Sequence, residues 1–287
     1  MTFPIADTYE NLTYGFEFEF IGNSDPESLR HFEQVMHHLN VPYQYTGKYG
    51  QNEDDAWVLG ADGSVGDFDT EKTLGGNFGF ELVSPVLTLK DFSVLGKVLD
   101  AVKSCLSGYV NDTCGTHVHV GGISFMRRGD YTGNESFTRG NCAVWLFSKL
   151  QPYLWNRLVH ISRANNKYCA RYEEGPYETD KYLALSSSGF MTYVKHPTME
   201  CRLHHGTLDV EEITEWAQVV SRFLWFCFHE NPRVHIDISE SPDQIASSLL
   251  SQFQVPETLS KRLITRMGER HGEEHSRDRY PYRFHAG

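Results

Sequence analysis

The chain has 287 residues and a mass of 32.9 kDa; 40% of its residues are hydrophobic, 22% charged and 13% aromatic. That length can bury a sizeable core within one large domain. Because 26 basic residues face 38 acidic ones, the net charge is -12, and the positive field typical of nucleic-acid binders is not expected. No apolar run reaches transmembrane length, and residues 1–11 show no signal-peptide pattern, so we expect a cytoplasmic protein without a membrane partner. The six cysteines form no Cys-x-x-Cys pair, which favours buried thiols in a reducing compartment.

The first predicted strand runs from about Thr13 to Ile21 and leads through a turn at residues 22–26 into a helix ending near Asn40. Residues 41–79 are rich in Tyr, Gly, Asp and Asn. They include short strand segments around an Asp62-Gly63 turn, and we expect an otherwise irregular loop that covers part of the site.

Helical spacing of apolar residues predicts a helix over residues 90–107, before a strand that ends at Gly121-Gly122. A Gly-rich loop to Thr138 precedes a long helical region, which Pro152 is expected to kink or divide. A short strand is expected near Leu185.

After a last strand around Glu200, Asp209 and Glu212 form a capping-box-like pair that predicts a helix start. Two more helices are expected over residues 242–251 and 257–267. We therefore expect one catalytic domain over residues 1–267 and a charged, mobile or partner-bound tail over residues 268–287. The alternation of strands and helices indicates an α+β fold.

Four of the predicted strands carry acidic, imidazole or guanidinium side chains on one face. Side chains at positions i and i+2 of a strand leave the same face, and apolar residues occupy the other. The residues concerned are Glu17 and Glu19, Glu81, His117 and His119, and Glu200 and Arg202. Each pair alone is more often a solvated surface feature than a ligand set. The recurrence on separate strands indicates one metal or catalytic site.

The chemistry of this set points to phosphate and divalent metals. Several carboxylates provide the hard oxygen ligands that Mg²⁺ or Mn²⁺ prefers, in numbers that suit two ions. Arg202 adds a planar cation suited to bidentate contact with phosphate or carboxylate. Metals together with arginine are typical of phosphoryl transfer.

These residues resemble a known family. Glu-x-Glu on the first strand, Glu-Leu-Val-Ser-Pro at residues 81–85, Gly-Thr-His-Val-His-Val-Gly at 115–121 and the late Glu-x-Arg are similar to the motifs of the amidoligases. The resemblance extends from about Thr13 to Phe228. It implies a glutamine synthetase-like catalytic domain with a curved, mainly antiparallel sheet, a polar concave face and helices on the other face. It also implies ATP-dependent ligation of a small-molecule or peptide carboxylate to an amine through an acyl phosphate.

The resemblance also implies roles for individual residues. One metal would be held near the ATP phosphates and a second near the acyl phosphate. Arg202 and Glu81 would be the catalytic residues, Arg202 by stabilising phosphate, and His119 would contact nucleotide phosphate. The ligands implied are Glu17, His117 and Glu200 for the first metal, and Glu19 and Glu81 for the second.

Other residues are assigned less directly. Arg163, Lys167 and Arg171 could form a basic edge that binds cofactor phosphates, or a solvated helix face. Asp62, Asp67 or Asp69 could complete the second metal site, although Asp62 also suits a turn.

Among the remaining histidines, strand alternation predicts His204 on the face of Glu200 and Arg202, at the rim. His205 and the His37-His38 pair are interpreted as structural or surface residues. His271 and His275 could bind metal adventitiously.

Two further hypotheses stay open. One is a single-metal hydrolase or oxygenase that uses His117, His119 and one glutamate; the other is a non-catalytic binding protein with the same fold. Unlike glutamine synthetase, the chain has no room for a domain before the first strand, so an oligomer is possible and the last wall of the pocket is undetermined. The substrates, which we expect the loops at residues 41–79 and 122–138 to select, are undetermined too.

Overall fold

The computed structural model describes residues 8–47, 55–66, 77–123, 134–164, 169, 183–187, 198–229 and 233–275. Within these ranges the chain builds one seven-stranded sheet with the order β2-β3-β4-β1-β5-β7-β6. Neighbouring strands are antiparallel except for the parallel β2–β3 pair. The strands are β1 Thr13–Asn23, β2 Tyr43–Tyr45, β3 Trp57–Ala61, β4 Asn77–Val83, β5 Gly115–Gly121, β6 Leu185–Ser186 and β7 Thr198–His205. The expected mainly antiparallel α+β fold is confirmed.

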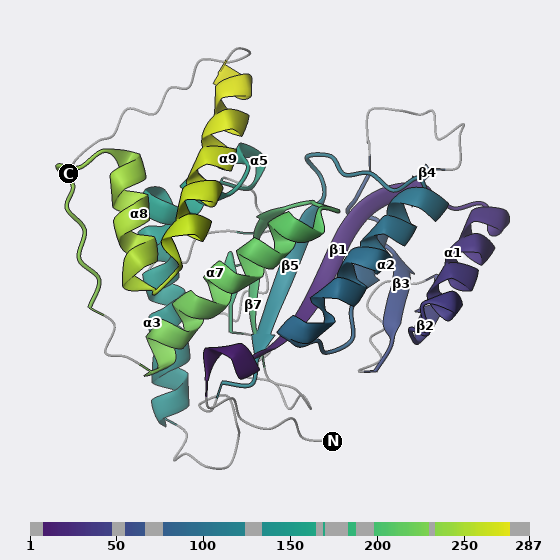
Figure 1. Ribbon diagram of the computed structural model, residues 1–287, viewed down its shortest axis with the longest axis horizontal. Coiled ribbons are helices and arrows are strands. Elements are labelled where there is room, and N and C mark those ends of the chain that lie inside the picture. Colours follow the sequence, from purple (N-terminus) through teal and green to yellow (C-terminus); the bar gives the residue numbers. More distant parts are fainter. Residues whose placement is uncertain are drawn as a thin grey trace.

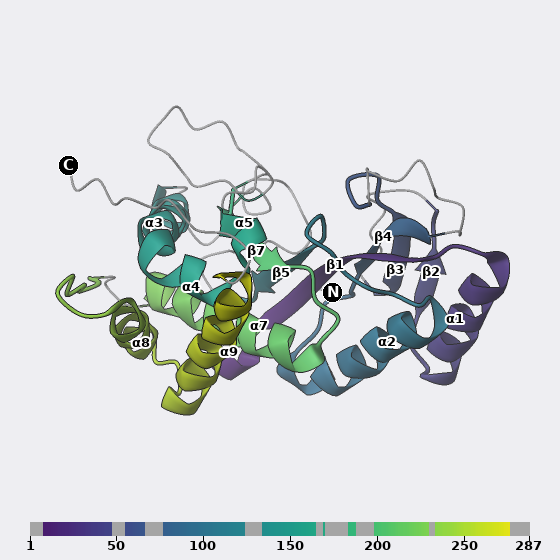
Figure 2. The same ribbon diagram turned by 90° about the horizontal axis from the view of Figure 1, so that it is seen from above.

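Helices cover one face of this sheet. Helix α2 (Phe92–Cys105) lies along β1 and α7 (Val210–His229) along β5 and β7, while α1 (Pro26–His38) packs beside α2 and β2 (Figure 1). Seen from above, α1, α2, α7 and α9 lie on the same side of the strands (Figure 2). Helix α3 (Asn134–Leu150) packs on α7, and α8 (Pro242–Gln252) packs on α9 (Glu257–His275). The short elements are η1 Tyr9–Asn11, η2 Leu89–Asp91, η4 Gln151–Trp155, α4 Asn156–Leu158 and α5 Ile161–Ala164.

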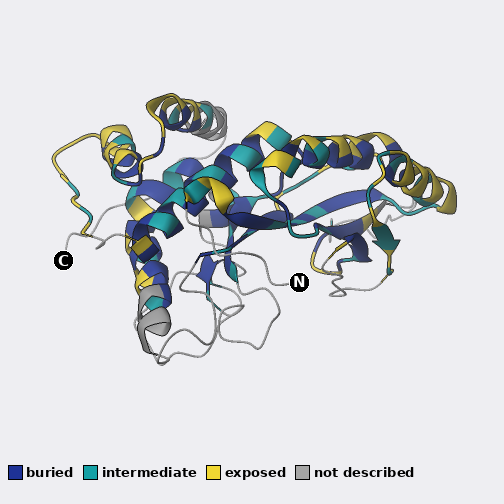
Figure 3. Cartoon of the chain, turned by 60° about the horizontal axis from the view of Figure 1, so that its bottom comes forward, coloured by how far each residue is buried: buried dark blue, intermediate teal, exposed yellow. Residues whose placement is uncertain are grey.

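The central strand β1 separates apolar from acidic side chains. Phe16, Phe18 and Phe20 are fully buried on the helix side, where the Phe16 ring meets Phe92 of α2 edge-on at 5.6 Å. Each such burial contributes about 1.5–3 kcal/mol. Glu17 and Glu19 alternate with them and are only half-buried on the other side, whereas most residues of the strand are buried (Figure 3). Packing of the phenylalanines therefore fixes which face carries the glutamates.

The expected helix signals are also present. Asp25 caps α1 by accepting hydrogen bonds from the backbone N–H groups of Glu27 and Ser28 at 2.9 Å. Pro152 lies in η4, a π-helical turn that separates α3 from α4, and it has no backbone N–H to donate to a regular α-helix. Among the helices that the structure describes, none is long and apolar enough to cross a membrane.

Within residues 41–79 the expected short strand before the Asp62-Gly63 turn is present as β3, and the stretch also holds β2 and the start of β4. Two expectations need adjustment. Helix α9 continues to His275, beyond the expected end at residue 267, and only residues 276–287 of the tail lie outside the described residues. The six cysteines are free, as expected, but Cys142 is exposed.

Candidate active site

Strand register brings the predicted acidic and imidazole residues together on the face opposite α2 and α7. Glu17 lies opposite His117 of β5, and Glu19 lies opposite Glu81 of β4. On the far side of β5, His119 lies opposite Glu200 of β7. Residues directly opposite in an antiparallel pair have side chains on the same face. Four strands therefore contribute to one polar surface.

The first cluster consists of Glu17, His117 and Glu200, whose potential ligand atoms all lie within 4.8 Å of one another. His117 Nδ1 is 2.7 Å from Glu17 Oε2 and 3.7 Å from Glu200 Oε1. The imidazole is almost fully buried, with 1% of the residue exposed. Two carboxylates and one imidazole at this separation match a divalent metal site with mixed oxygen and nitrogen ligands.

The second cluster consists of Glu19, Asp62 and Glu81, again with potential ligand atoms within 4.8 Å of one another. Asp62 therefore supplies the third carboxylate that the motifs left open. Its Oδ1 also accepts hydrogen bonds from Ser64 N and Ser64 Oγ at 2.8 and 2.7 Å, so it is a turn residue as well. All three groups are acidic, which is typical of Mg²⁺ or Mn²⁺ sites.

Gly79 allows this turn to approach β4. A Cβ atom at position 79 would lie 2.2 Å from the Val65 carbonyl oxygen and 2.4 Å from that of Asp62. Only a residue without a side chain permits Asp62 N to donate to the Gly79 carbonyl at 2.8 Å in this position. The glycine thus holds Asp62 beside Glu81.

Other polar atoms connect and orient the two clusters. His117 Nε2 lies 3.5 Å from Glu19 Oε1, so one imidazole touches both groups. Glu19 Oε2 accepts a 2.6 Å hydrogen bond from Gly115 N. Arg202 donates from Nη1 to Glu200, which places its guanidinium beside the first cluster as expected. His119 lies 3.1 Å from Glu17 Oε1, and its other ring nitrogen is 3.2 Å from Thr198 Oγ1.

The crowding of carboxylates shifts their proton affinities. Burial, then the charges of Glu17, Asp62 and Glu19, raise the pKa of Glu81 to about 9. Burial opposes ionisation of Glu17 too, but the charge of His119 and hydrogen bonds from His117 and His119 outweigh it and hold the Glu17 pKa well below its usual range. Burial would lower the pKa of His119, yet the charges of Glu200 and Glu17 raise it to about 9.

The raised pKa of Glu81 and the charges around it bear on whether these residues suit divalent ions. Among the described residues, five buried or half-buried carboxylates face three cationic or imidazole groups: His117, His119 and Arg202. The carboxylates are Glu17, Glu19, Asp62, Glu81 and Glu200. Without a metal ion, the protein offsets this excess of negative charge by keeping Glu81 protonated. A bound cation would offset the same charge and leave Glu81 ionised. The donor set and its surplus of negative charge therefore fit Mg²⁺ or Mn²⁺.

Arg163 is placed differently from the expected basic edge. The residue is 1% exposed, and Nη2 donates to the backbone carbonyl of Arg202 at 2.8 Å. Its guanidinium packs over Gly115, where a Cβ atom would lie 2.8 Å from Nη2. This geometry gives Arg163 a role in supporting β7 under Arg202 and does not favour a phosphate contact. Lys167 and Arg171, like Asp67 and Asp69, lie outside the described residues.

The expected position of His204 is wrong. Val118 pairs with Cys201 and Thr116 with His204, so β7 carries one residue more than β5 over this interval. Such a bulge reverses the side-chain alternation. His204 consequently lies on the helix face, with its ring 5.1 Å from that of Trp216 in α7.

Several motif residues are structural. Ser84 of the Glu-Leu-Val-Ser-Pro motif accepts a hydrogen bond from Phe16 N at 2.9 Å, which joins β4 to β1. Thr116 Oγ1 accepts from Thr207 N at 3.1 Å. The capping box expected at Asp209 is half formed: Asp209 accepts from Glu212 N at 3.3 Å, but the Glu212 carboxylate binds Thr207 and His205. The signal that could have identified a His205–Glu212 contact was an adjacent His pair before an acidic helix start.

The fold and the polar face define an α+β protein with two adjacent clusters of metal-competent residues. The family described as "Putative amidoligase enzyme" matches residues 10–189, and the chain belongs to this family. The matched range contains three of the four motifs, whereas Glu200 and Arg202 lie beyond it. A search among curated proteins found no match.

Two solved structures similar to this chain are both of GmaS. The one titled as the GmaS/ADP complex in conformation 1 is 12% identical, covers 94% of this chain and 71% of its own, and has a TM-score of 0.44. The one titled as apo GmaS without ligand is 13% identical, covers 91% and 69%, and has a TM-score of 0.41.

Proposed function

We propose that the protein is an ATP-dependent ligase that joins a carboxylate to an amine through an acyl phosphate, with two divalent ions. The observation that carries the proposal is the pair of three-residue clusters that share β1, Glu17–His117–Glu200 and Glu19–Asp62–Glu81. Family membership supports amide formation. The paired clusters support phosphoryl transfer, because two adjacent ions neutralise the attacking and leaving oxygens of such a displacement.

The reaction needs two steps. An oxygen of the substrate carboxylate attacks the γ-phosphorus of ATP, which forms the acyl phosphate and releases ADP. The amine then attacks the acyl carbon, the carbon–oxygen bond to phosphate breaks, and the amine loses a proton as the amide and inorganic phosphate form. Mg²⁺ or Mn²⁺, when bound, would neutralise charge on the transferred group.

The protein's own residues would orient the phosphates. Glu200 holds the Arg202 guanidinium at the edge of the first cluster, where it would bind phosphate oxygens. Thr198 Oγ1 lies 3.2 Å from His119 Nδ1 and fixes the ring beside the first cluster. An imidazole fixed in this place suits a contact with nucleotide phosphate.

The single-metal hydrolase or oxygenase is favoured less. His117, His119 and Glu17 would suffice for such a site, but they leave the second cluster without a role. A non-catalytic protein would not need five carboxylates on one face, since their mutual repulsion destabilises the fold. The single-metal alternative predicts no ATP binding, and the non-catalytic alternative predicts that the glutamates are dispensable.

The test is calorimetric titration of ATP into wild-type protein with and without Mg²⁺. We expect Mg²⁺-dependent binding that Glu17→Gln abolishes, because that variant removes one ligand with little change in volume. Glu33→Gln, the same change at an exposed position of α1, is the matched control and should bind as wild type. ADP release can then be screened over pairs of carboxylates and amines. Absence of ATP binding by folded wild-type protein would overturn the proposal.

A further inference from the structure

Two turns meet at the end of the polar face, next to the second cluster. The Asp62 turn (residues 62–66) follows β3, and the β5 turn (residues 111–114) leads into β5. The backbone N–H of Gly66 in the Asp62 turn donates to Thr113 Oγ1 in the β5 turn at 3.2 Å. Because 47 residues separate Gly66 from Thr113 in the sequence, this contact exists only in the folded chain.

Apolar side chains support the same junction. Ile21 follows Glu19 by two residues on β1, so both lie on the polar face. Ile21 is only 4% exposed, because it packs with Val65 of the Asp62 turn and Cys114 of the β5 turn. The two turns therefore cover the end of β1 together, and Glu19 is the next residue of this face.

Hydrogen bonds within the β5 turn orient the Thr113 hydroxyl. Asn111 Oδ1 accepts from Thr113 N at 2.9 Å and from Thr113 Oγ1 at 2.6 Å. The hydroxyl has one proton, and Asn111 accepts it, so the lone pairs of Thr113 Oγ1 are directed to other donors. Asn111 thereby makes Thr113 an acceptor for the Gly66 N–H.

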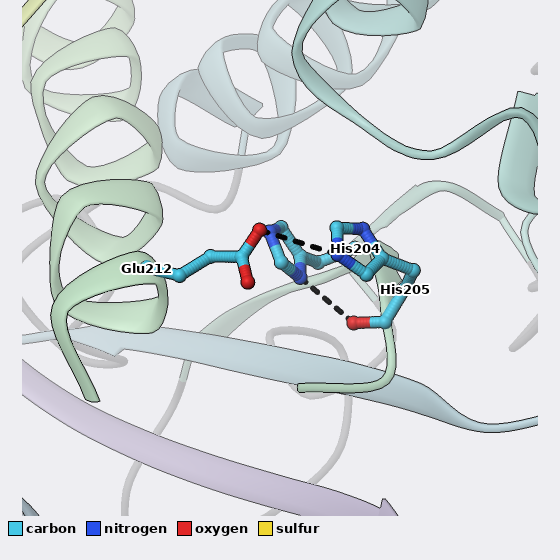
Figure 4. A group of neighbouring side chains, drawn as sticks. All are labelled: His204, His205 and Glu212. Carbon is cyan, nitrogen blue, oxygen red and sulfur yellow. Dashed lines mark hydrogen bonds and ion pairs between the residues drawn. The ribbon is translucent and has the colours of Figure 1, made fainter. Parts of the chain in front are cut away.

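The β5 turn is itself anchored to the connection between β7 and α7. Gly206 N donates to the Cys114 carbonyl oxygen at 2.9 Å. A Cβ atom at position 206 would lie 2.5 Å from Cys114 Cβ, so this close approach requires glycine. The residue before Gly206 is tied to α7, since His205 Nε2 lies 3.2 Å from Glu212 Oε1 (Figure 4). The β5 turn is thus held by a fixed part of the fold.

Each turn holds one ligand of the second cluster. Asp62 itself begins the Asp62 turn, and Gly115, which directly follows the β5 turn, donates its N–H to Glu19 Oε2 at 2.6 Å. The third ligand, Glu81, lies within β4. All three ligands of the first cluster lie within β1, β5 and β7, where strand pairing fixes them. A change at the junction of the turns should therefore affect the second cluster alone.

We propose that Thr113 and Asn111 are positioning residues for the second metal site. The inference rests on the proposed function, because it requires an ion at the second cluster. Thr113 would hold the far end of the Asp62 turn and so keep the Asp62 carboxylate within ligand distance of Glu19 and Glu81. Hydrogen bonds outside the ligand set commonly orient metal ligands in this way.

Mn²⁺ provides the test, because the free hydrated ion gives a sharp electron paramagnetic resonance signal that is lost when it binds to a protein. Metal-stripped full-length protein is titrated in two backgrounds: Glu17→Gln leaves the second cluster intact, and Asp62→Asn leaves the first. In the Glu17→Gln background we expect Thr113→Val to weaken Mn²⁺ binding about tenfold. In the Asp62→Asn background the same change should leave Mn²⁺ affinity unaltered.

Three further variants separate positioning from a general loss of structure. Thr113→Ser keeps the hydroxyl and should bind Mn²⁺ as the parent protein does, whereas Thr113→Ala should behave as Thr113→Val. Thr258→Val, the same change at an exposed position of α9, is the matched control. Thermal melting of each variant shows that the protein compared is folded.

The outcomes distinguish this inference from the proposed function. It is overturned if folded Thr113→Val and Thr113→Ala bind Mn²⁺ at the second cluster as tightly as the parent, if both clusters weaken equally, or if Thr113→Ser does not restore binding. Absence of any Mn²⁺ binding that depends on Asp62 would overturn it together with the two-ion proposal. The expected Mn²⁺ result from a protein that fails to bind ATP would support the positioning role and refute the ligase.

Discussion

Replacement of Glu81 by Gln should make the metal-free protein more stable at alkaline pH while it removes a metal ligand. The folded protein holds the pKa of Glu81 at about 9, against an ordinary value of 4.5. A group whose pKa is raised by folding stabilises the native state fully below its unfolded pKa. That contribution is lost as the pH rises from 4.5 through 9.

The expected size follows from the proton difference between the two states. From about pH 6 to about pH 8 the unfolded chain has lost the Glu81 proton and the folded chain keeps it. Each pH unit then costs about 1.4 kcal/mol, or roughly 3 kcal/mol over this interval. Glu81→Gln cannot titrate and should not show this loss. His119, whose pKa is also raised, titrates in both proteins and largely cancels in the comparison.

Urea unfolding at a series of pH values, without metal, measures this difference. With saturating Mg²⁺ the wild type should regain the lost stability, because the ion replaces the proton, whereas Glu81→Gln should gain only the stabilisation from the ion of the first cluster. Calorimetry of Mg²⁺ binding near neutral pH, in buffers of different ionisation enthalpy, should show release of close to one proton by wild type. Parallel pH profiles of wild type and Glu81→Gln would refute the reasoning, since Glu81 would then be ionised in the fold. Glu33→Gln should follow wild type throughout.

Three further predictions concern the surroundings of the two clusters. Asp62→Asn keeps an oxygen for the turn but removes a charge, so calorimetry should show one Mg²⁺ fewer per chain; unchanged stoichiometry would contradict the second cluster. Gly79→Ala puts a methyl group 2.4 Å from the Asp62 carbonyl oxygen, so we expect a lower melting temperature and at least about tenfold weaker Mg²⁺ binding. Wild-type values for both would show that Gly79 is not needed to hold Asp62 beside Glu81. Arg163→Lys should lower the free energy of unfolding by about 2–3 kcal/mol, because it weakens the hydrogen bond to Arg202 O, and Mg²⁺ binding should be retained. A loss of ATP affinity without a loss of stability would instead indicate that Arg163 binds phosphate.

The sequence predicts those parts of the site that depend on alternation within single strands. Phe16, Phe18 and Phe20 face the helices, so Glu17 and Glu19 must face away from them, and the same rule places His117 and His119. Alternation fails at His204, because a bulge adds a residue whose position depends on the pairing of β7 with β5. No pattern in the local sequence marks that bulge.

The spacing of residues along the sequence also does not reveal which side chains are buried or which distant segments come into contact. The i, i+4 spacing of Arg163 and Lys167 does not tell a solvated helix face from a guanidinium buried against the carbonyl of Arg202. Asp62 is at once a turn residue and a member of the second cluster, since Gly79 admits the turn against β4. Both facts come from segments that are distant in sequence and meet only in the folded chain.

The central position of β1 explains why the folding pattern and the proposed chemistry depend on each other. Glu17 lies opposite His117 of β5 and Glu19 lies opposite Glu81 of β4, so one strand supplies one ligand to each cluster. Two residues of a strand span about 7 Å, which brings the two clusters close enough to share His117. A slip of one residue in β1 would turn both glutamates into the core and the phenylalanines onto the polar face, and this costs the burial of three aromatic rings. The hydrophobic packing that holds the register is therefore the same interaction that sets the distance between the two proposed ions.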